Sequence, residues 1–255
     1  MNIQKYNMVF QNLTQKYDLT ESNMFKKYLH AFLVADNCFS LASSLYFNEE
    51  ERDFAYLCGL VHDIGRMEQW DRYASFSDSK TKHHSILGST LLETGWAEKF
   101  GLSKSQQKLL CQIVLYHASP YKGNDKNVRK FLQVLRNSDN YANLQNTSNG
   151  MEKLWSDKDG VSEEVLYKFQ NRINLHGTPI VTKLDRILQF LSRAYCIEFP
   201  LFQKDLLARK YLNSIYDVYS KQLTTEDKKI LYEECWRLKR ELANEMTCVH
   251  NNYNG

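Results

Sequence analysis

Apolar residues recur every three or four positions along most of the chain, which is the spacing that gathers them on one face of an α-helix. A sequence with only 10 glycines and 3 prolines has too few turn residues for a many-stranded β-sandwich. We therefore expect an all-α fold, with Gly65 closing the second helix as a C-cap. The predicted helices cover about 25–45, 50–63, 83–96, 103–117, 127–144, 161–174, 180–197, 200–222 and 225–246.

Two polar segments interrupt the helical pattern. The first, 73–82, is rich in Ser, Asp and Lys, and the second, 146–160, crowds Asn, Ser, Gly and Asp together. We expect residues 1–145 to form a core, 146–160 a surface loop, and 161–255 a C-terminal helical layer that packs on the core.

Charge and composition narrow the possible partners and location. The 33 basic and 30 acidic residues leave a net charge of +3 and are mixed along the chain, which argues against a nucleic-acid partner. The apolar stretch Ala31–Phe47 contains Asp36 and Asn37, so no membrane span is expected. The N-terminus lacks the apolar region of a secretory signal, and no two of the 6 cysteines form a CxxC pair. We expect a cytoplasmic protein with reduced, mainly buried cysteines.

Six histidine and aspartate side chains fall on the predicted inward faces of helices or at their ends. A buried imidazole or carboxylate must be hydrogen-bonded, paired or bound to a metal. Helices that direct several such groups at one interior are how a bundle builds a metal site. We therefore expect one or two divalent ions per chain (Fe, Mn, Zn, Ni or Co), and Asp63 could bridge two. The candidate ligands are His30, His62, Asp63, His84, His117 and Asp139.

The segment His62-Asp63-Ile64-Gly65-Arg66-Met67-Glu68-Gln69, with His30 before it and Asp139 after it, resembles the HD-domain superfamily of metal-dependent phosphohydrolases. It looks like a bacterial subfamily written HDIGR-x-EQ, and the resemblance covers about residues 24–145.

The resemblance implies an HD-domain helical bundle with additional C-terminal helices. It implies that His30, His62, Asp63 and Asp139 hold a first metal. Similarity to the binuclear branch implies that Asp63, His84 and His117 hold a second, although His84 and His117 could instead orient ligands or contact substrate. The GYP triplet of the cyclic-dinucleotide phosphodiesterases is absent, since Ala118-Ser119-Pro120 follows His117. That absence argues against cyclic di-GMP as the substrate.

The function that we expect is hydrolysis of a nucleotide or other small phosphoester by metal-activated water. Asp63 and Arg66 would be catalytic, and Arg66 could clamp a phosphate oxygen or form a surface salt bridge at its helix end. Further substrate contacts are predicted for Lys82, His83 and Arg136, with His83 also a candidate to support a ligand. Both Glu68 and Asp78 could orient ligands or water, or could have a capping or solvated role.

Two other functions remain open from the sequence. An HD-type di-iron oxygenase acting on a small polyol or phosphonate would use the same ligand types. A non-catalytic HD module would bind a nucleotide and signal. A homodimer is a further possibility.

Overall fold

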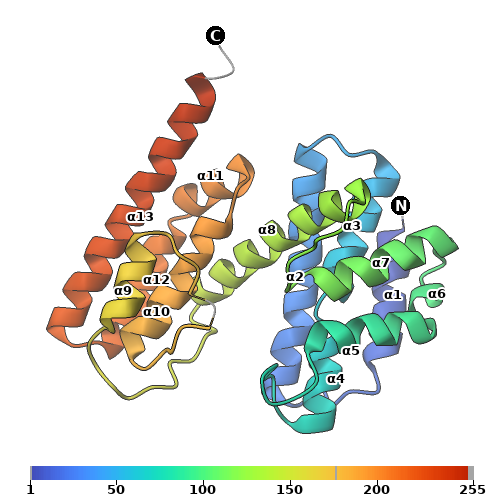
Figure 1. The fold of residues 1–255 in the computed structure, drawn as a ribbon, viewed down its shortest axis with the longest axis horizontal. Coiled ribbons are helices and arrows are strands. Elements are labelled where there is room, and N and C mark those ends of the chain that lie inside the picture. Colours follow the sequence, from blue (N-terminus) through green and yellow to red (C-terminus); the bar gives the residue numbers. More distant parts are fainter. Residues whose placement is uncertain (1, 176, 252–255) are drawn as a thin grey trace. The chain divides into compact units, whose positions relative to one another are not determined.

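The computed structural model describes residues 2–175 and 177–251, with side chains described as far as Glu245, and contains no strand in these ranges. The predicted all-α fold is confirmed. Contacts divide the chain into two compact units, Met1–Asp139 and Asn140–Gly255. The division falls within one long helix, and each unit has its own set of helices (Figure 1).

The helices of the first unit are α1 (Ile3–Thr14), α2 (Ser22–Ser44), α3 (Glu49–Val61), α4 (Ile64–Tyr73), α5 (His84–Leu91), α6 (Ala97–Lys99) and α7 (Lys104–Tyr116), with a π-helical turn over Leu92–Trp96. The helix that spans the division is α8 (Lys126–Ser148). The second unit contains α9 (Glu163–Gln170), α10 (Lys183–Leu191), α11 (Pro200–Ala208), α12 (Tyr211–Tyr219) and α13 (Thr225–Asn251), with 3₁₀ turns over Ser192–Cys196 and Ser220–Gln222.

Local sequence signals explain where the central helices of the first unit begin. The Asn48 side chain accepts a hydrogen bond from the Glu51 amide, and the Glu51 side chain accepts one from the Asn48 amide. Ser103 and Gln106 form the same reciprocal capping box at the start of α7. These caps set the register of α3 and α7, whose C-terminal ends fall at two of the candidate metal ligands.

The predicted role of Gly65 as a C-cap is wrong, because Gly65 lies in the first turn of a helix that the apolar pattern did not predict. The chain bends at Asp63 and resumes as α4 at Ile64. A Cβ atom at Gly65 would lie 1.9 Å from the carbonyl oxygen of His84 and 2.6 Å from the amide nitrogen of Gly88. Glycine is needed here so that α4 can lie directly against α5.

Other boundaries also differ from the predicted ones. The predicted helix over 200–222 is broken at Lys210, whose φ of 56° is left-handed and starts a new helix. α8 continues to Ser148, into the segment predicted as a loop from residue 146. The first helix, α1, was not predicted at all. The packing of the C-terminal helices on the core stays a prediction.

Cysteine placement agrees with the expectation from the sequence. The five cysteines whose side chains are described are free, and all of them except Cys196 are buried. The Cys248 side chain lies outside the described residues. None of the helices in the described part of the chain combines the length and the apolar character that a membrane-spanning segment requires.

Replacing Gly65 by alanine tests the close approach of α4 to α5. We expect Gly65→Ala to lower the free energy of unfolding by about 3 kcal/mol, since the two helix backbones must separate to admit the methyl group. The control is Gly160→Ala, where an added Cβ meets no atom within 4 Å and only the φ of 86° is unfavourable. It should cost about 1–2 kcal/mol. Urea unfolding measures both, and an equal loss for the two variants would contradict this reading of α4.

Candidate metal centre

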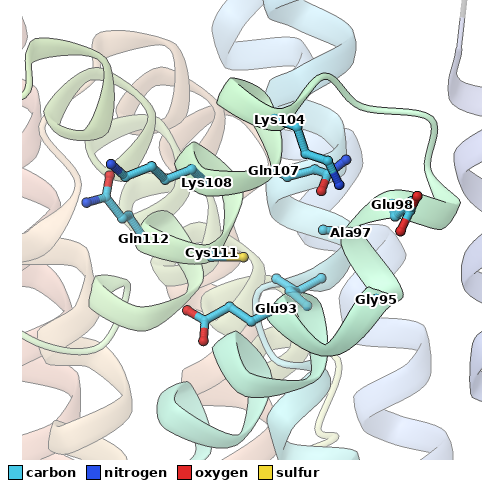
Figure 2. Close-up of a pocket in the computed structure, with 10 residues that line it drawn as sticks. Glu93, Gly95, Ala97, Glu98, Lys104, Gln107, Lys108, Cys111 and Gln112 are labelled. Carbon is cyan, nitrogen blue, oxygen red and sulfur yellow. The ribbon is translucent and has the colours of Figure 1, made fainter.

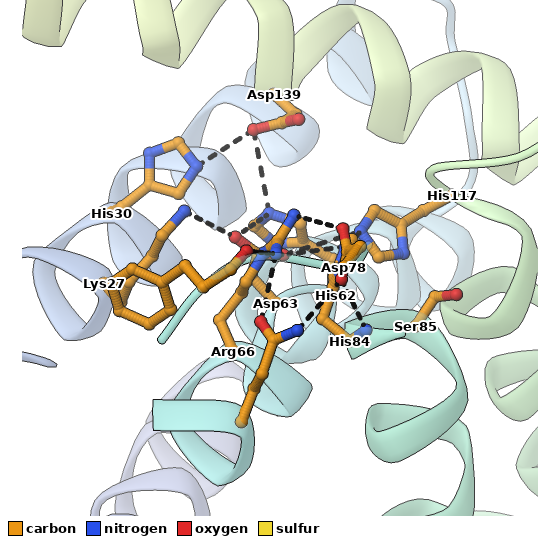
Figure 3. Close-up of polar contacts among 12 residues, drawn as sticks. Lys27, His30, His62, Asp63, Arg66, Asp78, His84, Ser85, His117 and Asp139 are labelled. Atoms are coloured by element: carbon orange, nitrogen blue, oxygen red, sulfur yellow. Dashed lines mark hydrogen bonds and ion pairs between the residues drawn. The ribbon is translucent and has the colours of Figure 1, made fainter. Parts of the chain in front are cut away.

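The six candidate ligands come from separate helices of the first unit and meet in its interior (Figure 3). The α2 and α8 helices supply His30 and Asp139 from within their length. The others stand at helix ends: His62 follows α3, Asp63 precedes α4, His84 begins α5 and His117 follows α7. Helix ends place side chains where the chain turns, so several helices can contribute to one small volume.

His30, His62 and Asp139 form the first group of candidate ligands. One ligand atom from each lies within 4.8 Å of the others. Nε2 of His30 is 2.9 Å from Oδ1 of Asp139, and Nε2 of His62 is 3.7 Å from the same oxygen. Oδ2 of Asp63 lies 3.8 Å from Nε2 of His62. These four side chains could therefore hold one ion.

Asp63, His84 and His117 form a second group, again with one ligand atom of each within 4.8 Å of the others. Oδ1 of Asp63 is 3.5 Å from Nε2 of His84 and 3.5 Å from Nε2 of His117. The two oxygens of Asp63 thus face different groups, which is the arrangement a bridging carboxylate needs.

Hydrogen bonds to the far side of the imidazole rings determine which nitrogens can bind a metal. Nδ1 of His62 donates to the carbonyl oxygen of Gly59 at 2.7 Å, and Nδ1 of His117 donates to that of Val114 at 2.7 Å. A neutral imidazole has one proton, so Nε2 of each ring keeps its lone pair. Nε2 of His62 is buried and has no hydrogen-bond partner. A lone pair in that position fits a cation.

The protonation states also suit metal binding. Burial lowers the pKa of His62 to about 4 and also lowers the pKa of His84, so both rings are neutral near pH 7. Burial alone would raise the pKa of Asp63, but Lys27 and the nearby imidazoles hold it well below its usual value. Burial alone would likewise raise the pKa of Asp139, but the His30 and His62 rings together hold it below its usual value. Neutral imidazoles and ionised carboxylates are the forms that bind divalent ions.

Residues 28–147 match the family model of the HD domain. This part of the chain is an HD domain. The HD domain places it in the superfamily of metal-dependent phosphohydrolases, whose members bind divalent metals. No curated protein and no solved structure matches the chain.

The sequence reasoning missed one charged residue at the site, Lys27, which directly precedes the matched segment. Nζ of Lys27 donates to Oδ2 of Asp63 at 2.9 Å, and the Lys27 side chain is 28% exposed. Lys27 lies three residues before His30 on α2, so the two side chains share a helix face. That spacing is the signal that could have identified it.

Arg66 lies closer to the loop after α4 than to the ligands. Its guanidinium donates to the Phe76 carbonyl at 2.6 Å and pairs with Asp78 at 3.0 Å. Its Nε is 3.9 Å from Oδ1 of Asp63. The side chain is 18% exposed, so this is not a solvated surface ion pair. A phosphate contact by Arg66 stays a prediction.

The side chains of Arg136 and Lys82, also predicted to contact substrate, differ in their surroundings. Arg136 donates to the carbonyls of Tyr116, His117 and Ser119, which commits its guanidinium to the end of α7. Lys82 is exposed, and its carbonyl accepts from Gln69. A substrate contact by Arg136 or Lys82 stays a prediction.

Of the two adjacent histidines, His84 is the better candidate ligand. His84 is buried beside Asp63, whereas the His83 side chain is 35% exposed and caps α5 by accepting from the Ser85 amide. The preference for His84 stated from the sequence therefore fits the contacts of both rings.

A surface cavity of about 470 Å³ lies elsewhere in the first unit, between the π-helical turn and α7 (Figure 2). Its charged lining residues are Glu93, Glu98, Lys104 and Lys108. None of the six candidate ligands lines it, so the cavity does not bear on the chemistry of the centre.

Asp63 is the residue whose loss should disrupt both groups. We expect Asp63→Ala to lose bound metal, because each group would lose a carboxylate ligand, while helix content stays near that of the unchanged protein. Metal analysis and circular dichroism would measure these effects. Exposed Asp71 on α4 provides the control, and Asp71→Ala should keep its metal. Undiminished metal in Asp63→Ala would disprove the assignment of the centre.

The lowered pKa of His62 predicts an effect of pH on the metal-free protein. Between pH about 6.5 and about 4 the unfolded chain binds a proton at this ring that the folded protein does not. Stability should therefore be full above pH 6.5 and fall as the pH drops toward 4. Thermal unfolding after chelator treatment would measure the slope, and His62→Gln should make it shallower. His83→Gln serves as the control and should leave the slope unchanged.

Proposed function

We propose that this HD domain hydrolyses a nucleotide or another small phosphoester. The observation that carries the proposal is the position of the Asp63 carboxylate. Its Oδ2 lies near His62 and its Oδ1 lies near His84, so it contacts both groups of candidate ligands. The cationic side chains of Lys27 and Arg66 lie beside it. Imidazoles, a shared carboxylate and flanking cations are the parts from which proteins build sites for phosphoryl chemistry.

His30, His62, Asp63 and Asp139 would hold one ion, and Asp63, His84 and His117 would hold another. Bound divalent ions lower the pKa of water and offset the negative charge of phosphate oxygens. Asp63 keeps its negative charge at neutral pH because Lys27 and the imidazoles stabilise the carboxylate. His62 stays neutral because its burial disfavours the imidazolium ion.

Lys27 is the stronger of the two candidates to contact the phosphate. The guanidinium of Arg66 is held by Asp78 and the Phe76 carbonyl, whereas the Lys27 ammonium donates to Asp63. An ammonium has three donors, so Lys27 could keep this contact and still donate to a substrate oxygen.

Replacing Lys27 tests this assignment. Lys27→Met keeps the length of the side chain and removes its charge, so kcat/KM for a phosphoester should fall about 10- to 100-fold. The control is Lys126→Met, at an exposed position at the start of α8, which should change kcat/KM less than 2-fold. Equal kcat/KM for Lys27→Met and the unchanged protein would show that Lys27 does not contact the phosphate.

The function itself is tested with metal-loaded protein and a panel of nucleotides, cyclic nucleotides and phosphomonoesters. Release of phosphate or a nucleoside monophosphate, lost in Asp63→Ala, is the expected result. Oxygen consumption by the iron-loaded protein with a polyol or phosphonate would instead indicate the di-iron oxygenase. Nucleotide binding without turnover would indicate the non-catalytic module.

A further inference from the structure

The loop between α4 and α5 places the carboxylate of Asp78 against the first turn of α5 (Figure 3). Oδ1 of Asp78 accepts a hydrogen bond from the backbone amide of His84 at 2.9 Å. Both carboxylate oxygens also lie 2.9 Å from Nδ1 of the His84 ring. Asp78 therefore contacts His84 on the side of the ring that faces away from the metal centre.

Two side chains of α4 hold Asp78 in this position. Nη2 of Arg66 lies 3.0 Å from Oδ2 of Asp78, and Nε2 of Gln69 donates to Oδ1 at 3.1 Å. Gln69 is fully buried and also donates to Oγ1 of Thr81 and to the carbonyl of Lys82. The loop is thus attached to α4 on both sides of Asp78.

The contact with Asp78 determines where the proton of His84 lies. An ionised carboxylate can only accept hydrogen bonds, and Asp78 is paired with Arg66 and already accepts the backbone amide of His84. Nδ1 of His84 must therefore carry the ring proton. Nε2 keeps its lone pair, 3.1 Å from Nε2 of His117 and 3.5 Å from Asp63.

Asp78 could in principle be a metal ligand itself, because Asp78, His83 and His84 also have ligand atoms within 4.8 Å of one another. The hydrogen bonds argue against this. Nδ1 of His83 accepts from the Ser85 amide at 3.3 Å, so the proton of the neutral His83 ring lies on Nε2, which is 3.8 Å from Asp78. Both imidazoles would present an N–H to Asp78, which leaves no nitrogen lone pair for an ion there.

We propose that Asp78, held by Arg66 and Gln69, is a positioning residue that fixes the orientation and the tautomer of His84. The proposal rests on the proposed function in taking His84 as a ligand of the second ion. A carboxylate behind a ligand imidazole orients the ring and increases its basicity, and its loss commonly weakens metal binding 10- to 100-fold.

The first test uses the metal-free, full-length protein with ¹⁵N-labelled histidine. Long-range ¹H–¹⁵N NMR reports which ring nitrogen carries the proton, and His84→Gln assigns the signals of His84. The unchanged protein should show the Nδ1–H tautomer alone. Asp78→Asn should show a mixture, because a carboxamide can donate as well as accept. The matched control is Glu68→Gln, since Glu68 pairs with Lys16 and Arg72 and not with an imidazole.

The second test measures the affinity for two successive zinc ions by competition with a chelator. Asp78→Asn should weaken binding of the second zinc ion about 10-fold, and Asp78→Ala up to about 100-fold. The affinity for the first ion should stay within about 3-fold of that of the unchanged protein. If Asp78→Ala does not fold, the isosteric Asn variant decides the question. A single His84 tautomer in Asp78→Asn, an unchanged second ion, or equal weakening of both ions would each overturn the proposal.

These outcomes can be separated from failure of the proposed function. Zinc binding by the unchanged protein without turnover of any phosphoester would refute the hydrolase and leave the role of Asp78 to the two tests. Failure of the unchanged protein to bind a second zinc ion would overturn the role of Asp78, since His84 would then have no ion to hold, and would leave the hydrolase to the substrate panel.

Discussion

Two imidazole nitrogens with lone pairs, Nε2 of His84 and Nε2 of His117, lie 3.1 Å apart beside an oxygen of the Asp63 carboxylate. Lone pairs and a negative charge at this distance repel one another unless a cation is shared among them. The far side of each ring donates a hydrogen bond, so neither ring can turn to relieve the repulsion without losing that bond. The other candidate ligands lie next to this pair, so the cluster as a whole could hold one or two cations.

Burial of Asp63 and His62 lowers the stability of the fold, but it also sets the protonation states that metal binding requires. Asp63 is held as an anion in the interior by Lys27 and the imidazoles around it, although removal from water opposes its charge. His62 responds to burial in the opposite sense and remains neutral. One apolar environment therefore yields an ionised carboxylate next to neutral imidazoles, which is the combination that binds divalent ions.

Five residues of the HDIGR-x-EQ segment have distinct structural roles. His62 and Asp63 face the centre, and Gly65 lets α4 lie against α5. Arg66 and Gln69 hold the loop that carries Asp78 behind His84. The segment thus supplies two candidate ligands and also supports a third, His84, which lies fifteen residues beyond Gln69.

The sequence by itself determined the all-α fold and the candidate ligand set, because helical periodicity places each histidine or aspartate on an inward face or a helix end. Those residues are His30, His62, Asp63, His84, His117 and Asp139, and the structure brings all six together. Only the tertiary structure decided that Lys27 pairs with Asp63, that Asp78 lies behind His84, and that Gly65 is a contact point between helices. The reason is physical: periodicity acts within one helix, whereas the distance between side chains of different helices depends on how those helices pack.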